Sequence, residues 1–226
     1  MTDLLNQVSE PLAALGWSEF FAVQLTPDET GYSRMRIATV HRSRMTAGSE
    51  VGSVKLSLPS QTNTTNFAVG DWVLVDPITR ALVRRLERRT LLQRRTAGAR
   101  TRQLIAANLD TIFIVTSCNN DFNPARLERY LALANEAGIT PVIVLTKADQ
   151  VADAGPYQKQ TAILQSGLDV VSLNAKTPEA VTALAPWCGP GQTVALVGSS
   201  GVGKSTLLNT LAAKPHEEVQ LTGGIR

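Results

Sequence analysis

The pattern of hydrophobic and polar positions changes its character near residue 104. Between residues 31 and 90, short apolar runs (MRIATV, GSVKLSL, DWVLVD and ALVRRL) are separated by turn residues such as Gly48, Gly52 and Pro59, which is typical of short strands. Several strands in so short a stretch predict a small β-barrel, and the five-stranded oligonucleotide-binding barrel is the leading candidate. An SH3-like barrel or an irregular β module is the alternative.

The rest of the chain has a different periodicity. Residues 1–30 have a short helical pattern and predict an N-terminal helical appendage. The run DTIFIVTS is continuous and apolar, as expected for a strand buried on both faces. PVIVLT predicts the next buried strand, and DVVSL and TVALV predict two further strands. Helical patterns lie between them, and Asn123 and Pro124 form a helix-start signal. Residues 105–226 therefore predict an α/β domain with a mostly parallel, doubly wound sheet, and residues 91–104 a basic linker. The predicted fold class is α/β plus all-β.

Composition excludes several classes of protein. The chain has 226 residues, of which 43 % are hydrophobic and 18 % charged, which is not the composition of a disordered chain, a collagen or a coiled coil. No apolar run reaches the roughly 18 residues that a membrane helix needs, and the N-terminus lacks a basic signal-peptide region. Cys118 and Cys188 lie far apart and suggest reduced thiols. We therefore expect a cytoplasmic protein that does not bind a membrane, and we expect a monomer.

The net charge of +3 conceals a concentrated basic segment. Residues 80–102 carry nine arginines and one acid, Glu87, so this segment is +8 and the remaining chain is −5. A concentrated arginine block suggests a polyanion such as RNA, because the planar guanidinium suits phosphate. A solvated basic linker is the alternative. The arginines are Arg80, Arg84, Arg85, Arg88, Arg89, Arg94, Arg95, Arg100 and Arg102.

A phosphate-binding loop lies near the end of the chain. The sequence GSSGVGKS matches GxxxxGK[ST] without departure, after an expected strand and before an expected helix. In such loops the glycines let backbone N–H groups form an anion nest, the lysine reaches the β- and γ-phosphates, and the serine hydroxyl binds Mg²⁺. Lys204 and Ser205 are therefore the predicted catalytic residues, and Ser205 is the predicted metal ligand. The nucleotide-binding loop is predicted as Gly198, Ser199, Ser200, Gly201, Val202, Gly203, Lys204, Ser205 and Thr206.

Two loops at strand ends can select the base. Asp149 follows the expected strand PVIVL, and its carboxylate can accept hydrogen bonds from both the ring N–H and the exocyclic amine of guanine. Adenine does not offer these donors, so two bonds to a charged group predict about a hundred- to ten-thousand-fold preference for guanine. Backbone N–H groups after the next strand can meet the guanine carbonyl. The predicted base-binding residues are Thr146, Lys147, Ala148, Asp149, Asn174, Ala175 and Lys176.

The order of these motifs resembles one family. TKAD (146–149) and NAK (174–176) precede GSSGVGKS (198–205), the order of a circularly permuted GTPase. Together with AVGDWVLVD (68–76) and AANLDTIFIVTSCNNDFNPARLERYL (106–131), the chain closely resembles the ribosome small-subunit-dependent GTPase A family. The resemblance implies a P-loop GTPase that binds GTP, GDP and Mg²⁺. It also implies binding to the small ribosomal subunit and its rRNA, assistance in late subunit maturation, and ribosome-stimulated GTP hydrolysis.

The chain departs from the family pattern at three places. Thr146 stands where Asn is common, which predicts weaker base binding or a weaker tie to the phosphate loop. Asn174 stands where Ser is common. The sequence ends at Arg226, before the family's DxPG-type motif and zinc-binding domain, so we expect an incomplete GTPase domain that binds nucleotide, hydrolyses GTP poorly and lacks Zn²⁺. An RNA-binding module with a regulatory, non-hydrolytic nucleotide site is the main alternative, and an ATPase with a coincidental TKAD sequence is another.

Overall fold

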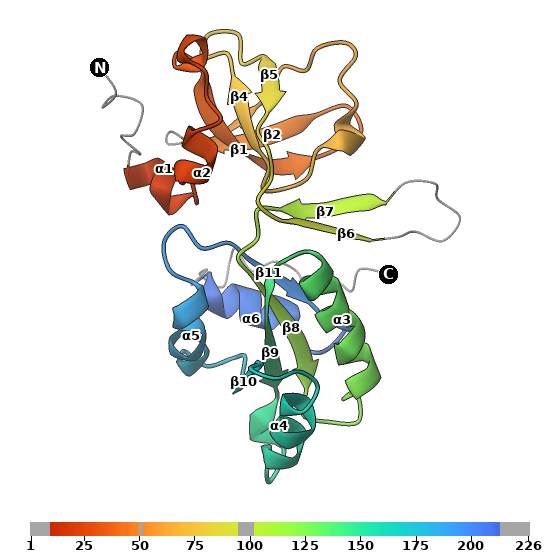
Figure 1. Cartoon of the computed structure of the whole chain (residues 1–226). Helices are drawn as coiled ribbons and strands as arrows, with labels where there is room; N and C mark the ends of the chain where they lie inside the picture. Colours follow the sequence, from red (N-terminus) through yellow and green to blue (C-terminus); the bar gives the residue numbers. More distant parts are fainter. Residues whose placement is uncertain (1–9, 50–51, 95–101, 213–226) are drawn as a thin grey trace. The chain divides into compact units, whose positions relative to one another are not determined.

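The computed structural model describes residues 10–49, 52–94 and 102–212 (Figure 1). The chain forms two compact units. The first consists of Met1–Leu109 with Pro190–Thr193, and the second of Asp110–Gly189 with Val194–Arg226. No helix in the described ranges is both long enough and apolar enough to cross a membrane.

The first unit contains a closed five-stranded barrel. All neighbouring strands pair antiparallel in the order β3-β2-β1-β4-β5. A parallel bridge between Ser57 and Ala81 joins the two sheet edges, with the Ser57 amide donating to the Arg80 carbonyl over 2.8 Å. The predicted five-stranded barrel is confirmed. Its strands are β1 (Ser33–Val40), β2 (Met45–Ser49), β3 (Gly52–Lys55), β4 (Trp72–Val75) and β5 (Leu82–Arg85).

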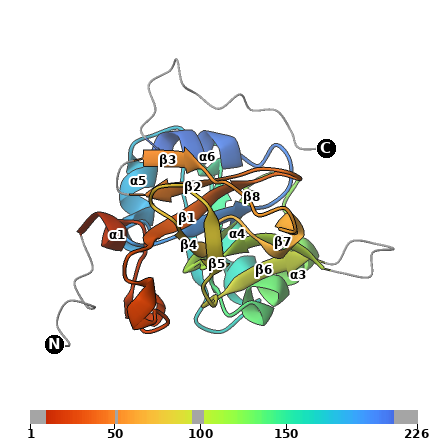
Figure 2. The same cartoon turned by 90° about the horizontal axis from the view of Figure 1, so that it is seen from above.

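Strand β4 is buried on both of its faces. Val73 and Val75 join the barrel interior, while Trp72 packs on the outside against Trp17 with 4.9 Å between ring centroids. Phe21 completes this outer cluster. The outer cover comes from the segment that contains α1 (Glu10–Ala14) and α2 (Glu19–Ala22), which lie along one side of the barrel (Figure 1). Figure 2 shows α1 beside the barrel from above. The short 3-10 turn η1 (Pro27–Glu29) follows α2 and has no buried residue. The N-terminal helical segment therefore provides part of this unit's hydrophobic core.

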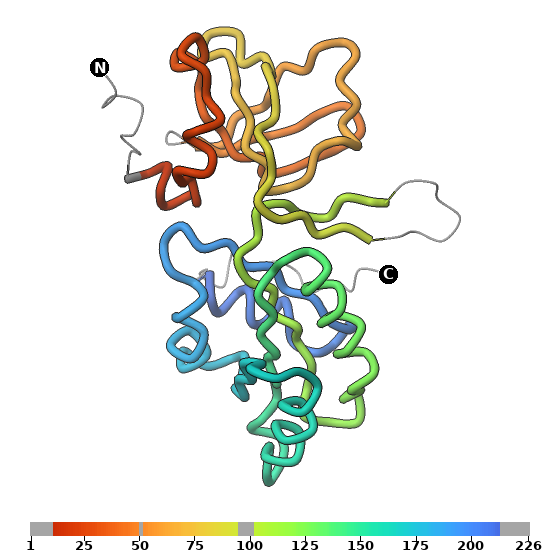
Figure 3. The backbone as a smooth tube through the Cα atoms, in the orientation of Figure 1, coloured from red at the N-terminus to blue at the C-terminus, as the bar shows by residue number. Residues whose placement is uncertain are grey.

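The segment predicted as a linker contains strands instead. β6 (Leu91–Arg94) and β7 (Gln103–Ala107) pair antiparallel, and the chain runs through them from the barrel towards β8 (Figure 3). Leu92 and Ala107 are buried, and the Ala107 amide donates to the Val69 carbonyl over 2.8 Å. The strand β6 is hard to recognise in the sequence, because only one of its four side chains is buried and it ends in an arginine. The connection at 95–101 lies outside the described residues.

The second unit is an α/β layer structure. Its strands follow the order β10-β9-β8-β11, and every pair is parallel. Phe113 and Val115 of the fully buried β8 pack with residues of α5 and α6 on one face, and α3 covers the other (Figure 1). The strands are β8 (Thr111–Ser117), β9 (Thr140–Thr146), β10 (Asp169–Ser172) and β11 (Val194–Val197). The helices are α3 (Pro124–Glu136), α4 (Gly155–Ala162), α5 (Glu179–Leu184) and α6 (Lys204–Leu211).

The strand order creates a switch point between β8 and β11. The chain passes outward from β8 to β9 and β10, and then returns to place β11 on the opposite side of β8. Ligands of doubly wound sheets bind in the crevice at the carboxyl ends of the strands beside such a point. The segments that follow β8 and β11 are therefore the expected walls of a ligand site.

Candidate nucleotide-binding site

The phosphate loop connects β11 to α6 and needs glycine at two positions. Gly198 has φ +144°, and a Cβ there would overlap the carbonyl oxygen of Val115 in the neighbouring strand. Gly203 has φ +94° and directly precedes α6. Residues other than glycine rarely adopt positive φ angles. The motif glycines thus let the loop turn sharply against β8 and begin the helix whose N-terminus favours anions.

Lys204 is folded back over the start of this loop. Its Nζ donates to the carbonyl of Gly198 over 3.0 Å and to that of Ser199 over 2.5 Å. Burial lowers the pKa of the Lys204 ammonium, because the charged form loses hydration. Phosphate oxygens would be stronger acceptors than these two neutral carbonyls. The ammonium therefore lies beside the loop and could donate to the phosphates of a nucleotide bound there.

Ser205 and Thr206 follow Lys204 in the first turn of α6 and are half-buried. The described residues contain no cluster of three or more His, Cys, Asp or Glu side chains that could hold a metal ion. Mg²⁺ commonly binds phosphates, water and only one or two protein ligands. A single hydroxyl at Ser205 therefore fits a nucleotide-bound Mg²⁺ ion.

Thr146 links the end of β9 to the phosphate loop. Its side chain is fully buried, and its Oγ1 lies 2.6 Å from the Val202 carbonyl and 3.1 Å from the Thr116 carbonyl. The methyl and hydroxyl groups of Thr146 also line the space beside Gly203. The predicted base loop and phosphate loop are therefore joined directly, even though a threonine stands at this position.

The rest of the TKAD sequence turns away from the core. Lys147 adopts the left-handed conformation directly after β9, with φ +57°, and Ala148–Gln150 form the 3-10 turn η3. The Ala148 amide lies 3.4 Å from the Leu173 carbonyl at the end of β10. Asp149 is exposed. Its carboxylate is therefore accessible to a ligand at the carboxyl edge of the sheet.

The NAK loop follows β10 and is held from two sides. Asn174 Oδ1 accepts from the Lys176 amide over 3.0 Å, and the hydroxyl of Thr210 in α6 donates to the Ala175 carbonyl over 2.7 Å. A contact between the Lys176 amide and a guanine carbonyl would require the first of these bonds to open. Thr210 connects the base loop to the helix of the phosphate loop, a role that sequence reasoning missed.

A second residue that sequence reasoning missed is Arg126. It lies in the first turn of α3, and its Nη1 donates to the Ser199 hydroxyl of the phosphate loop. The sequence pattern after Asn123 and Pro124 predicted only a helix at this place. The helical spacing gives no signal for this contact, because its partner lies 73 positions away.

Part of the basic segment holds the barrel together. Arg88 forms a bidentate ion pair with the completely buried Asp71, at 2.6 and 2.7 Å. Arg84 binds Glu29 in the same way, also at 2.6 and 2.7 Å. Arg80, Arg89, Arg94 and Arg102 are exposed and Arg85 is half-buried, while Arg95 and Arg100 lie outside the described residues. Only some of the nine arginines are therefore placed to meet a polyanion.

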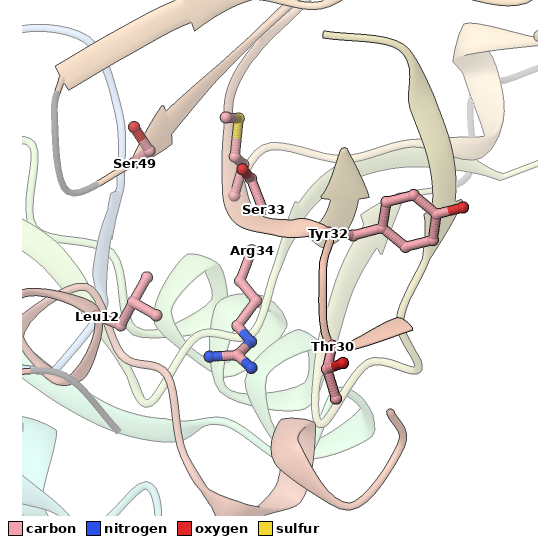
Figure 4. A pocket seen from close by; sticks show the side chains of 7 residues that line it. Leu12, Thr30, Tyr32, Ser33, Arg34 and Ser49 are labelled. Carbon is pink, nitrogen blue, oxygen red and sulfur yellow. The ribbon is translucent and has the colours of Figure 1, made fainter. Parts of the chain in front are cut away.

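The first unit also has a pocket of about 310 Å³. Figure 4 shows the Arg34 side chain projecting from β1 between Leu12 and Thr30. The guanidinium lies 5.6 Å from the centre of the Trp17 ring, an arrangement that stabilises a cation. None of the lining residues belongs to the predicted nucleotide site. They are Leu12, Thr30, Tyr32, Ser33, Arg34, Met35 and Ser49.

Comparison with known proteins identifies relatives over the whole chain. Residues 85–225 match the family model described as RsgA GTPase. A small ribosomal subunit biogenesis GTPase RsgA from Mesorhizobium japonicum is 58 % identical over 226 residues, which are 100 % of this chain and 65 % of that protein. Small ribosomal subunit biogenesis GTPase RsgA 2 from Vibrio vulnificus is 49 % identical over 217 residues, covering 95 % of this chain and 60 % of the relative.

Solved structures agree on the fold. YjeQ from Thermotoga maritima aligns with a TM-score of 0.62 and 24 % identity, covering 80 % of this chain and 65 % of that one. YloQ, described as a circularly permuted GTPase, aligns with a TM-score of 0.59 and 23 % identity, covering 82 % of this chain and 66 % of that one. The chain thus spans less than two thirds of the length of these relatives. Because the family model matches most of its residues, the chain belongs to the RsgA GTPase family.

Proposed function

We propose that this chain binds GTP and GDP with Mg²⁺ and is the nucleotide-binding part of a GTP hydrolase. The observation that carries the proposal is the bond from Thr146 to Val202, which joins a base-selecting loop to a complete phosphate loop. In the proposed site, Asp149 accepts two hydrogen bonds from guanine, and the alkyl stem of Lys147 lies against the purine. The loop amides and Lys204 hold the phosphates, and Ser205 contributes its hydroxyl to the metal ion.

The chemistry that this site supports is phosphoryl transfer to water. Catalysis of this kind depends mainly on positioning and on stabilising the charge of the phosphoryl group. Lys204 supplies a positive charge, and the N-terminus of α6 adds its dipole. Bound Mg²⁺ would supply further neutralisation of the phosphate oxygens. The proposed role of each site residue is inferred from its position relative to the phosphate loop.

We further propose that the partner is the small ribosomal subunit with its rRNA, and that the protein assists subunit maturation in the cytoplasm. The RsgA relatives bear the name small ribosomal subunit biogenesis GTPase. A five-stranded barrel of this topology and a basic segment are suited to binding RNA. The exposed arginines of the β6–β7 segment are the proposed phosphate contacts, and the protein acts as a monomer.

Phosphate release from GTP by the full-length protein tests this function. Addition of small ribosomal subunits should increase the turnover rate, whereas large subunits should not. A Lys204→Ala variant should lose turnover both with and without subunits. Guanine nucleotide binding with no phosphate release under any of these conditions would instead support the non-hydrolytic RNA-binding alternative.

A further inference from the structure

Two cations meet at one residue of the phosphate loop. Lys204 Nζ donates to the Ser199 backbone carbonyl, and Arg126 Nη1 donates to the Ser199 side-chain hydroxyl. Both acceptors are neutral oxygens. Charged donors form their strongest hydrogen bonds with anions. Within residues 10–49, 52–94 and 102–212, neither cation at Ser199 forms an ion pair with a carboxylate.

Arg126 differs in this respect from the arginines that stabilise the barrel. Arg84 and Arg88 each bind a carboxylate through two short hydrogen bonds. Among the described residues, Arg126 forms no ion pair with a carboxylate, and the one hydrogen bond of its guanidinium goes to the Ser199 hydroxyl. A half-buried guanidinium that meets a single hydroxyl retains donors suited to a planar, bidentate anion such as phosphate.

The position of Arg126 follows from the fold. Its backbone amide is capped by Asn123 Oδ1 over 3.1 Å, and Pro124 occupies the first helical position. Leu127 and Leu131 bury one side of α3. The helix follows β8 while the phosphate loop follows β11, and these two strands flank the switch point of the sheet. Arg126 is therefore held by a well-anchored helix turn at the ligand-binding edge.

We propose that Arg126 is a phosphate ligand of the nucleotide site, which exchanges the Ser199 hydroxyl for the terminal phosphate of bound GTP. This inference rests on the proposed function. Because Lys204 reaches the β- and γ-phosphates in such loops, a guanidinium at the same loop residue lies at the same end of the nucleotide. Arg126 then supplies from within the chain a second positive charge beside the group that is transferred.

The test measures affinity against the number of phosphates. Arg126→Ala should weaken the binding of a non-hydrolysable GTP analogue by about ten- to a hundredfold. The loss should be smaller for GDP and absent for GMP. Arg126→Lys keeps the charge and should retain most of the affinity for the GTP analogue. Arg126→Gln keeps only a neutral donor for Ser199 and should lose as much as Arg126→Ala.

Arg129→Ala is the matched control, because Arg129 is an exposed arginine of the same helix. It should leave all three affinities unchanged. Equal losses for the GTP analogue, GDP and GMP, or full retention of affinity by Arg126→Gln, would overturn the proposal and make Arg126 a structural support of the loop. The same series of measurements with ATP, ADP and AMP distinguishes a failure of the proposed function from a failure of the proposed role of Arg126. Equal affinities for guanine and adenine nucleotides would contradict the proposed function. The dependence of affinity on the number of phosphates would still test Arg126.

Discussion

The Thr146 hydroxyl lies 2.6 Å from the carbonyl oxygen of Val202, and this contact joins the base loop to the phosphate loop. The same hydroxyl lies 3.1 Å from the Thr116 carbonyl. A hydroxyl has one proton, so it donates fully to only one of these carbonyls at a time. The shorter distance favours Val202. The threonine thereby makes the connection between the two loops that its departure from the family motif placed in doubt.

Removal of this hydroxyl should weaken nucleotide binding. Thr146→Val has nearly the same shape but leaves a buried carbonyl without its donor, which costs about 1–3 kcal/mol of unfolding free energy. We expect the affinity for GDP to fall about tenfold, because the loop carbonyl at Val202 is no longer held. Calorimetric titration measures the affinity. Thr146→Ser keeps the hydroxyl and should bind GDP nearly as wild type; equal losses in the two variants would contradict the role of the hydrogen bond.

The two structural glycines of the phosphate loop should differ in their tolerance of alanine. Gly203→Ala introduces backbone strain at positive φ, of about 1–3 kcal/mol, while its Cβ would lie no closer than 3.5 Å to Thr146. Gly198→Ala adds an overlap with the backbone of Val115. Thermal unfolding should therefore show a larger loss of stability for Gly198→Ala. A larger loss for Gly203→Ala would mean that the loop does not approach β8 as described.

The basic segment should bind RNA through its exposed arginines. Replacement of Arg94 and Arg102 by glutamine removes two charges beside the β6–β7 connection. The slope of log affinity against log salt should then become less steep by about 1.4–1.8 for a small-subunit rRNA fragment. Arg42→Gln with Arg44→Gln removes two exposed arginines outside the segment and is the control. An equal change in slope for both double variants would remove any special role of the segment.

The ion pair between Glu29 and Arg84 should make the free energy of unfolding depend on pH in the acidic range. Hydrogen bonds from Arg84 and from the Thr26 backbone lower the pKa of Glu29 from 4.5 to about 2. Because the pKa is lowered in the folded state, the stabilisation is fully present above pH 4.5 and is lost as the pH falls towards 2. Urea unfolding between these values should show a steeper loss for wild type than for Glu29→Gln. Parallel curves would show that the ion pair is absent in solution.

Much of the fold was predictable from local sequence. The runs that became β8 and β9 contain few polar residues because these central strands are almost completely buried, whereas β10 and β11 are only partly buried. The Asn123–Pro124 signal marked the start of α3 correctly. β2 was missed because Met45–Ser49 consists largely of small and polar residues, and β6 because it ends in arginine. Such strands are specified by pairing with their neighbours.

The candidate site was predictable as a set of motifs but not as a set of contacts. The GxxxxGK[ST] spacing identified Gly198, Gly203 and Lys204 because their roles are local to one turn and one helix start. The contact of Arg126 with Ser199 and that of Thr210 with Ala175 join positions 73 and 35 residues apart. A local sequence pattern cannot predict such pairs, because it is the strand order of the sheet that brings the two residues of each pair together.

Competition between GDP and ADP measures the base selectivity of the nucleotide site. GDP should bind about a hundred- to ten-thousand-fold more tightly than ADP, because Asp149 is expected to accept two hydrogen bonds from guanine. Asp149→Asn should lose this preference and favour xanthosine diphosphate, whose base carries a carbonyl in place of the guanine amine. Equal affinities of the wild-type protein for GDP and ADP would contradict the assignment of this site to guanine nucleotides.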